Sequence, residues 1–120
     1  MKVAVTSLGE GLDSKVDTRF GRAKYYVLYD TETKETETID NSVNMNASHG
    51  AGIQAAEAVA NTGASVLITG NVGPNAFRSL DAVGIKVFTG ADGDTVREAI
   101  AKYERGELGS ADGANVEGHW

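Results

Sequence analysis

The sequence predicts an α/β domain in which a mixed sheet carries helices on both faces. Short runs rich in apolar and β-branched residues, typical of buried strands, recur along the chain. Glycines stand at the ends of these runs and mark short connections. From Ser65 onward strands alternate with helical patterns, which indicates parallel βαβ units.

Five segments have the composition of strands. Lys2–Ser7 is rich in β-branched residues, and Tyr25–Tyr29 is an apolar run that follows a long loop. Glu35–Ile39 alternates polar and apolar residues, so we expect a hairpin with the preceding strand at an edge of the sheet. Ser65–Thr69 is a short apolar strand of the kind buried on both faces, and Ile85–Thr89 is the next strand.

Two helical segments separate the later strands. Residues 51–62 carry apolar side chains near helical spacing, and Gly63 is a suitable stop. Pro74 starts the second segment, because proline is favoured in the first turn, where its missing N–H would have had no partner. Gly84 ends this second helix.

A third helix follows the last strand. Its apolar residues obey the i, i+3, i+4, i+7 rule of an amphipathic helix, and the last of them is Tyr103. Its start has two alternatives. Asp94 can cap the helix, or Thr95 and Glu98 can form a capping box one residue later. The order of elements places helices on both faces of a mixed sheet.

The composition excludes several functional classes. The chain has 120 residues, no cysteine and a formal net charge of −6. The lack of cysteine excludes disulfides, thiolate zinc sites and iron–sulfur clusters ligated by thiolates of this chain. The acidic balance disfavours a broad phosphate-binding surface, and no apolar run approaches the ~20 residues that cross a bilayer. We therefore expect a cytoplasmic protein that binds neither nucleic acid nor a membrane.

Charge and glycine content divide the chain into two parts. Residues 1–105 hold all the predicted elements, and we expect them to form a single ligand-binding domain. Residues 106–120 lack Lys and Arg, carry Glu107, Asp112 and Glu117, and contain few large apolar groups. Such a segment buries too little surface to offset its ordering entropy, so we expect a flexible, acidic, glycine-rich tail.

Four segments are expected to meet beyond the carboxyl ends of the strands, where open α/β sheets bind ligands. They are Arg19–Arg22, His49–Gly52, Gly70–Pro74 and Thr89–Ala91. Two of them open helices, whose N-termini present unpaired N–H groups and about half a positive charge each. The two arginines add fixed positive charge. Together these segments predict an anion site within an acidic protein.

Each of these features also has a structural explanation that needs no ligand. Arg19 and Arg22 could form surface ion pairs, which contribute only ~0–1 kcal/mol. The candidate partners are Asp13, Asp17 and Asp30. His49 could ligate a metal or donate to an anion, or it could simply neighbour a helix cap. Gly73-Pro74 is explained by helix initiation, and Asn71 suits a tight turn.

Two patterns point to other functions but lack the necessary context. Residues 50–55 match G-x-G-x-x-A, yet a dinucleotide fingerprint follows a buried strand directly, and here the polar residues 41–48 come first. The same three aspartates could suggest a carboxylate metal centre for nuclease chemistry, but they have no regular spacing. No general base stands beside a nucleophile, so we assign no catalytic residue and expect no enzymatic activity.

Several short motifs occur in an order that resembles a known family. They are FGRA at 20–23, Asn41 after the hairpin, GAGI at 50–53, VLITGNVGPNA at 66–76 and GIKV at 84–87. Over residues 1–103 the chain resembles the dinitrogenase iron–molybdenum cofactor biosynthesis family. This family of small proteins, similar to NifX and to the C-terminal part of NifB, includes the molybdenum–copper orange protein of sulfate-reducing bacteria.

The resemblance implies a three-layer α/β/α, ribonuclease-H-like fold around a five-stranded mixed sheet. It also implies non-enzymatic binding or carriage of a molybdenum-containing metal–sulfur cluster, of the Mo–Fe–S or Mo–Cu–S type. Backbone amides, arginine and His49 would hold this cluster non-covalently, with His49 as the metal ligand. The residues that would face it are Arg19, Phe20, Gly21, Arg22, Ala23, His49, Gly50, Ala51, Gly52, Asn71, Val72, Gly73, Pro74, Thr89, Gly90 and Ala91.

This chain departs from some members of the family in one respect. Those members carry a cysteine or several histidines in the same loops, whereas this chain has no cysteine at all. Two other functions stay open. The same fold could serve as a regulatory or protein-interaction module that binds a client protein through residues 106–120, with Trp120 as an anchor. An enzyme acting on a small anionic metabolite is the less favoured alternative.

Overall fold

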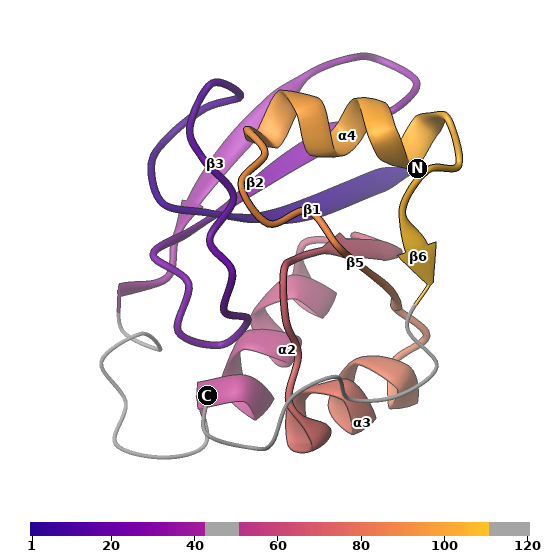
Figure 1. The fold of residues 1–120 in the computed structure, drawn as a ribbon. Coiled ribbons are helices and arrows are strands. Elements are labelled where there is room, and N and C mark those ends of the chain that lie inside the picture. The colour runs from indigo at the N-terminus through magenta and orange to yellow at the C-terminus, as the bar shows by residue number, and fades with distance from the viewer. Residues whose placement is uncertain (43–50, 111–120) are drawn as a thin grey trace.

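The computed structural model describes residues 1–42 and 51–110. The strands are β1 (Lys2–Ser7), β2 (Tyr25–Asp30), β3 (Thr36–Asp40), β4 (Val66–Ile68), β5 (Lys86–Thr89) and β6 (Gly109–Ser110). The helices are α2 (Ala51–Asn61), α3 (Pro74–Ala82) and α4 (Val96–Glu104). Helices α2 and α3 cover one face of the sheet and α4 covers the other (Figure 1), which confirms the predicted α/β class.

The strands form one mixed sheet in the order β3-β2-β1-β4-β5-β6. Strand β4 pairs parallel with β1 and with β5, whereas β2, β3 and β6 run antiparallel to their neighbours. The predicted hairpin is present, and β3 forms an edge of the sheet. Because the three parallel strands end on the same side, the loops after β1, β4 and β5 emerge together.

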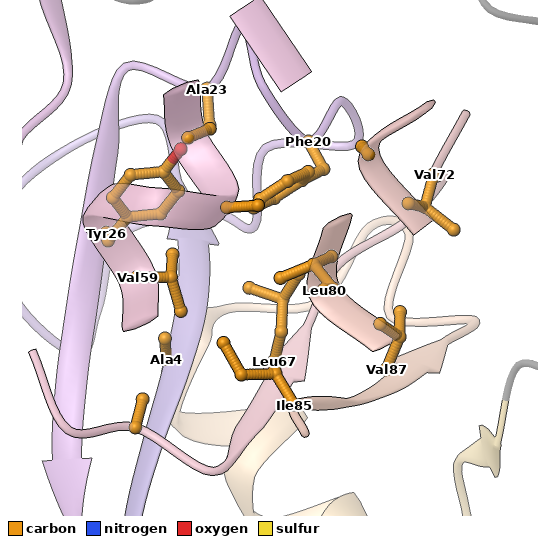
Figure 2. Close-up of a cluster of buried hydrophobic side chains, with 14 of the residues drawn as sticks. Ala4, Phe20, Ala23, Tyr26, Val59, Leu67, Val72, Leu80, Ile85 and Val87 are labelled. Atoms are coloured by element: carbon orange, nitrogen blue, oxygen red, sulfur yellow. The ribbon is translucent and has the colours of Figure 1, made fainter. Parts of the chain in front are cut away.

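Two hydrophobic cores lie on opposite faces of the sheet. The first lies beneath α2 and α3 and contains the fully buried side chains of Phe20, Tyr26 and Leu67 (Figure 2). The second lies beneath α4 and contains Ile68 and Ile100. Leu67 and Ile68 are consecutive in β4 and face different cores, as the two-residue period of a strand requires. Strand β4 is therefore buried on both faces, as expected.

Within the described residues the sheet has six strands, one more than the five expected. The additional strand, β6, has two residues and pairs antiparallel with the end of β5, where Phe88 lies opposite Ser110. It belongs to the segment expected to be a tail. A glycine followed by a serine gives no strand signal, so β6 could not be read from local sequence. Leu108, just before it, packs against the second core.

The starts of two helices resolve what the sequence left open. Pro74 is the first residue of α3, as expected. Helix α4 begins after Thr95, which forms the capping box with Glu98. Asp94 is not the cap, and its carboxylate lies 2.9 Å from the Lys102 ammonium. No helix in the described ranges is long and apolar enough to span a membrane.

Candidate ligand site at the carboxyl ends of the parallel strands

The loop after β1 is fastened directly to the loop between β4 and α3. Arg19 and Asn71 form an isolated parallel β-bridge, and the Phe20 N–H donates to the Asn71 carbonyl at 3.2 Å. The Asn71 side-chain amide donates in return to the Thr18 carbonyl at 3.0 Å. At Gly70 a Cβ atom would lie 2.8 Å from the Thr18 Cα. Only glycine therefore allows the two loops to approach this closely.

Asp17 fixes the shape of the segment Arg19–Ala23 from inside the protein. It is 2% exposed, and its two carboxylate oxygens accept the backbone N–H groups of Arg19 at 3.1 Å and Lys24 at 3.3 Å. The Arg19 Nε lies 3.6 Å from the same carboxylate, while the Arg19 side chain stays 41% exposed. The ion pair considered as an alternative therefore exists, but its carboxylate is buried and organises the loop. The arginine remains accessible to a ligand.

Asn41 holds the other side of this segment. It is buried, and its side-chain amide donates to the carbonyls of Ala23 at 2.7 Å and Gly21 at 3.3 Å. Gly21 has a φ of 94°, a left-handed conformation that glycine adopts without strain. Of the signals in the sequence, only the family resemblance pointed to Asn41, because a single asparagine after a strand has no periodicity that reveals its role.

The first turns of two helices meet next to this loop. Gly52 in α2 packs so closely on α3 that a Cβ atom there would lie 2.9 Å from the Ala76 Cβ. Gly73 is the N-cap of α3 and has no side-chain oxygen with which to cap it. Pro74 has no N–H, so the helix presents the N–H groups of Asn75 and Ala76, which have no partner within the helix. Two residues before the cap, Asn71 contacts Arg19.

The fourth predicted segment reaches the same end of the sheet from the other face. The Thr69 N–H donates to the Phe88 carbonyl at 3.0 Å, and Gly70 lies against the Asp92 carboxylate. The side chain of Ala91, however, is fully buried in the second core beneath α4. Gly90 is exposed, with a φ of 95°. Segment 89–91 therefore borders the site, and Ala91 itself does not face it.

Of the remaining predicted residues, Arg22 and Thr89 are half-buried, and the others divide into three groups. Phe20, Ala23 and Val72 are fully buried in the first core, so only their backbone groups are available to a ligand. Ala51 opens α2. His49 and Gly50 lie outside the described residues, as do Trp120 and most of the predicted tail.

The aspartates do not form a metal centre. Asp13 pairs with Arg97 at 3.1 Å on the surface, and Asp17 is occupied by the loop. Asp30 accepts the N–H groups of Glu32 and Thr33 in a turn, and these bonds lower the pKa of its carboxyl group. Among the described residues no group of three or more His, Asp or Glu side chains could hold a metal ion. This removes the structural basis of the nuclease alternative.

A small buried polar layer lies beneath the loops, and the sequence analysis missed it. The Thr6 hydroxyl donates to the Asp17 carbonyl at 2.6 Å, and its oxygen lies 2.9 Å from the Thr69 hydroxyl. Because a hydroxyl has one proton, the Thr69 hydroxyl is the donor to Thr6. Thr6 and Thr69 end buried strands and look like ordinary β-branched residues, so the sequence carried no signal for this layer.

Comparison with known proteins places the chain in a family. The family model described as "Dinitrogenase iron-molybdenum cofactor" matches residues 1–106. The chain belongs to this family. The resemblance carried by the short motifs is thereby confirmed. An uncharacterised protein of Methanocaldococcus jannaschii is 29% identical over 112 residues, which are 90% of this chain and 93% of that protein.

Two solved structures are similar to this chain over nearly its whole length. The apo form of the orange protein from Desulfovibrio gigas is 48% identical, with a TM-score of 0.94 over 96% of each chain. A proposed NifB protein from Thermotoga is 38% identical, with a TM-score of 0.84 over 98% of each chain. Both similarities cover 96% or more of each chain, so they concern the fold as a whole.

Proposed function

We propose that this protein binds and carries a molybdenum-containing metal–sulfur cluster without catalysing a reaction. The observation that carries the proposal is the uncapped first turn of α3, which lies beside the first turn of α2 and the Arg19 loop. Membership of the dinitrogenase iron-molybdenum cofactor family and the likeness to an orange protein support the same function. The cluster is cargo of the Mo–Fe–S or Mo–Cu–S type.

The chemistry of the available donors fits such a cargo. A thiometallate cluster is a polyanion whose sulfides accept hydrogen bonds, and the chain offers no thiolate that could ligate it. Helix N-termini and arginine side chains bind anions by hydrogen bonds and charge. The N–H groups of Asn75 and Ala76 and the half-exposed Arg19 are such donors. His49 is the proposed metal ligand, although it lies outside the described residues.

The buried residues around the site have positioning roles in this proposal. Asp17 and Asn41 hold the two ends of the segment 19–23, and Asn71 fastens it to the start of α3. A ligand therefore meets donors whose positions are already fixed, which lowers the ordering cost of binding. Hydrogen bonds from the ligand-facing N–H groups and Arg19 to the sulfides would tune the electronic properties of the cluster.

Reconstitution tests this proposal directly. The purified chain is incubated with tetrathiomolybdate and copper, or with tetrathiomolybdate and iron, and then passed over gel filtration. We expect a coloured protein fraction in which elemental analysis finds molybdenum and the second metal in fixed ratio to the chain. The variant Arg97→Glu, which changes an exposed arginine on α4, serves as a control that should load equally. A folded chain that elutes colourless and metal-free under every such condition contradicts the proposal.

A further inference from the structure

The hydroxyl group of Tyr26 is an unexplained polar group in the first core. The residue is 1% exposed, and its oxygen has no hydrogen-bond partner in the described part of the chain. Figure 2 shows this oxygen at the end of the ring nearest Ala23. Buried hydroxyl groups normally find a partner, and a phenylalanine would fill the same volume without this demand. Packing of the core therefore does not account for the Tyr26 hydroxyl.

Its position places it at the candidate site. Tyr26 lies near the start of β2, directly opposite Thr6 at the end of β1, so it belongs to the sheet end where the loops emerge. Its ring packs against Phe20, with ring centroids 6.0 Å apart. Ala23, toward which the hydroxyl points in Figure 2, is the last residue of the segment that Asp17 and Asn41 hold in place.

The neighbouring polar groups already have their partners. The Thr6 hydroxyl bonds to the Thr69 hydroxyl and donates to the Asp17 carbonyl, and the Asp17 carboxylate accepts two backbone N–H groups. Tyr26 is thus the one buried side-chain donor of this layer without a partner among the described residues. Burial, together with the nearby Asp17 charge, raises the pKa of Tyr26, so its hydroxyl keeps its proton and can only gain by donating it to an acceptor.

We propose that the Tyr26 hydroxyl is a ligand-directed hydrogen-bond donor that completes its bonding on the bound anionic cluster. The inference rests on the proposed function and extends it by one residue on β2. The acceptor is a sulfide or oxo group at the edge of the cluster that lies against the backbone of residues 21–23. In this role Tyr26 positions the cargo and adjusts its electronic environment, and no bond is made or broken.

The variant Tyr26→Phe removes only this hydroxyl. Tyr103→Phe is the matched control, because Tyr103 lies on α4 at the other face of the sheet and its hydroxyl donates to the Met1 sulfur, at 3.9 Å. We expect apo Tyr26→Phe to unfold at the same temperature as the parent or a higher one. Its dissociation constant for the cluster assembled from tetrathiomolybdate and copper should rise about tenfold, as for a lost hydrogen bond to a charged acceptor. The visible absorption maximum should also shift, and Tyr103→Phe should change none of these properties.

The outcomes separate this inference from the function beneath it. If the parent loads and Tyr26→Phe loads with the same affinity and spectrum, the inference is overturned and the proposed function stands. A lowered unfolding temperature of apo Tyr26→Phe would also overturn the inference, since the hydroxyl would then have a structural partner, such as a buried water. A parent chain that takes up no cluster overturns both.

Discussion

Helices α3 and α4 have nine residues each and begin in opposite ways. The first turn of α4 is fully satisfied by the protein. Thr95 and Glu98 exchange the two bonds of the capping box, and the N–H groups of Val96 and Arg97 donate to loop carbonyls at 2.8 and 2.9 Å. The first turn of α3 has a glycine cap, a proline and two N–H groups with no partner in the helix.

The two helices start at the same end of the sheet but on opposite faces, and the difference indicates what each start is for. At α4 the protein satisfies the positive end of the helix with its own acceptors, which stabilises the fold and leaves no donors for a ligand. At α3 the same positive end is left without a side-chain cap, beside a half-exposed arginine. Leaving such a helix end uncapped forgoes stability, and this pattern is expected where binding requires free donors.

The largest effect is expected at Gly70, where the loop after β1 contacts the loop between β4 and α3 at the candidate site. Gly70→Val places a branched side chain against the Thr18 backbone, where even a Cβ atom would be 2.8 Å from the Cα. We expect the free energy of unfolding to fall by ~3 kcal/mol and the melting temperature by roughly 10 °C, with loss of cluster uptake. Gly109→Val, with nothing within 4 Å of its Cβ, is the control. Equal melting temperatures for the two variants would show that the loops separate easily.

Reversal of the Arg19 charge at the candidate site should affect cluster binding more than stability. Arg19→Glu is expected to weaken cluster uptake roughly 30-fold, because an attractive cation becomes a repulsive anion, a change of ~2 kcal/mol. Its melting temperature should fall by less than that of Gly70→Val, because the buried Asp17 carboxylate loses its cation but keeps its two backbone N–H donors. Uptake measured beside Arg97→Glu tests this prediction. Equal losses of uptake and stability in Arg19→Glu would assign Arg19 a structural role only.

Removal of the cap at α4 should lower stability and leave cluster binding unchanged. Thr95→Ala deletes the oxygen that accepts the Glu98 N–H at 3.2 Å. We expect a loss of ~1 kcal/mol in the free energy of unfolding, measured by denaturant titration, and unchanged cluster affinity. A Thr95→Ala variant that folds but binds the cluster poorly would mean that the start of α4 also contributes to ligand binding.

The smallest effect concerns pH at the same cap. Glu98 accepts the Thr95 N–H at 2.8 Å, and this bond lowers the pKa of Glu98 from its ordinary 4.5. A lowered pKa in the folded state stabilises the protein above the ordinary pKa, and this stabilisation is lost as the pH falls through the lowered value. The melting-temperature difference between the parent and Glu98→Gln should be constant near neutral pH and shrink below about pH 4.5. A difference that grows in acid would contradict this assignment.

Local patterns in the sequence predicted most of the fold, because each pattern had a physical cause that acts within a few residues. Pro74 starts α3 and Thr95 with Glu98 caps α4 for reasons that need no tertiary contact. Strand β6 has no such cause. Gly109 and Ser110 become a strand only because β5 offers a free edge beside them.

The site was harder to predict than the fold, because its determinants are contacts between distant segments. The sequence predicted that loops from three strands meet at one end of the sheet, but it could not show that the Ala91 side chain lies in the core beneath α4. Asp17 looked like a surface partner for arginine and proved to be a buried acceptor of backbone N–H groups. Tyr26 looked like any aromatic residue of a strand, and only the three-dimensional structure reveals its unpartnered hydroxyl.

Backbone amide chemical shifts of the labelled chain, followed during titration with tetrathiomolybdate and copper(I), test the central claim most directly. The account predicts saturable changes at Asn75 and Ala76, whose N–H groups have no acceptor within the helix, and in the segment 19–23, which carries the half-exposed Arg19. The amides of Val96, Arg97 and Glu98, which already have acceptors, should stay unchanged. Changes centred on the first turn of α4, or spread evenly over the chain, would contradict the account.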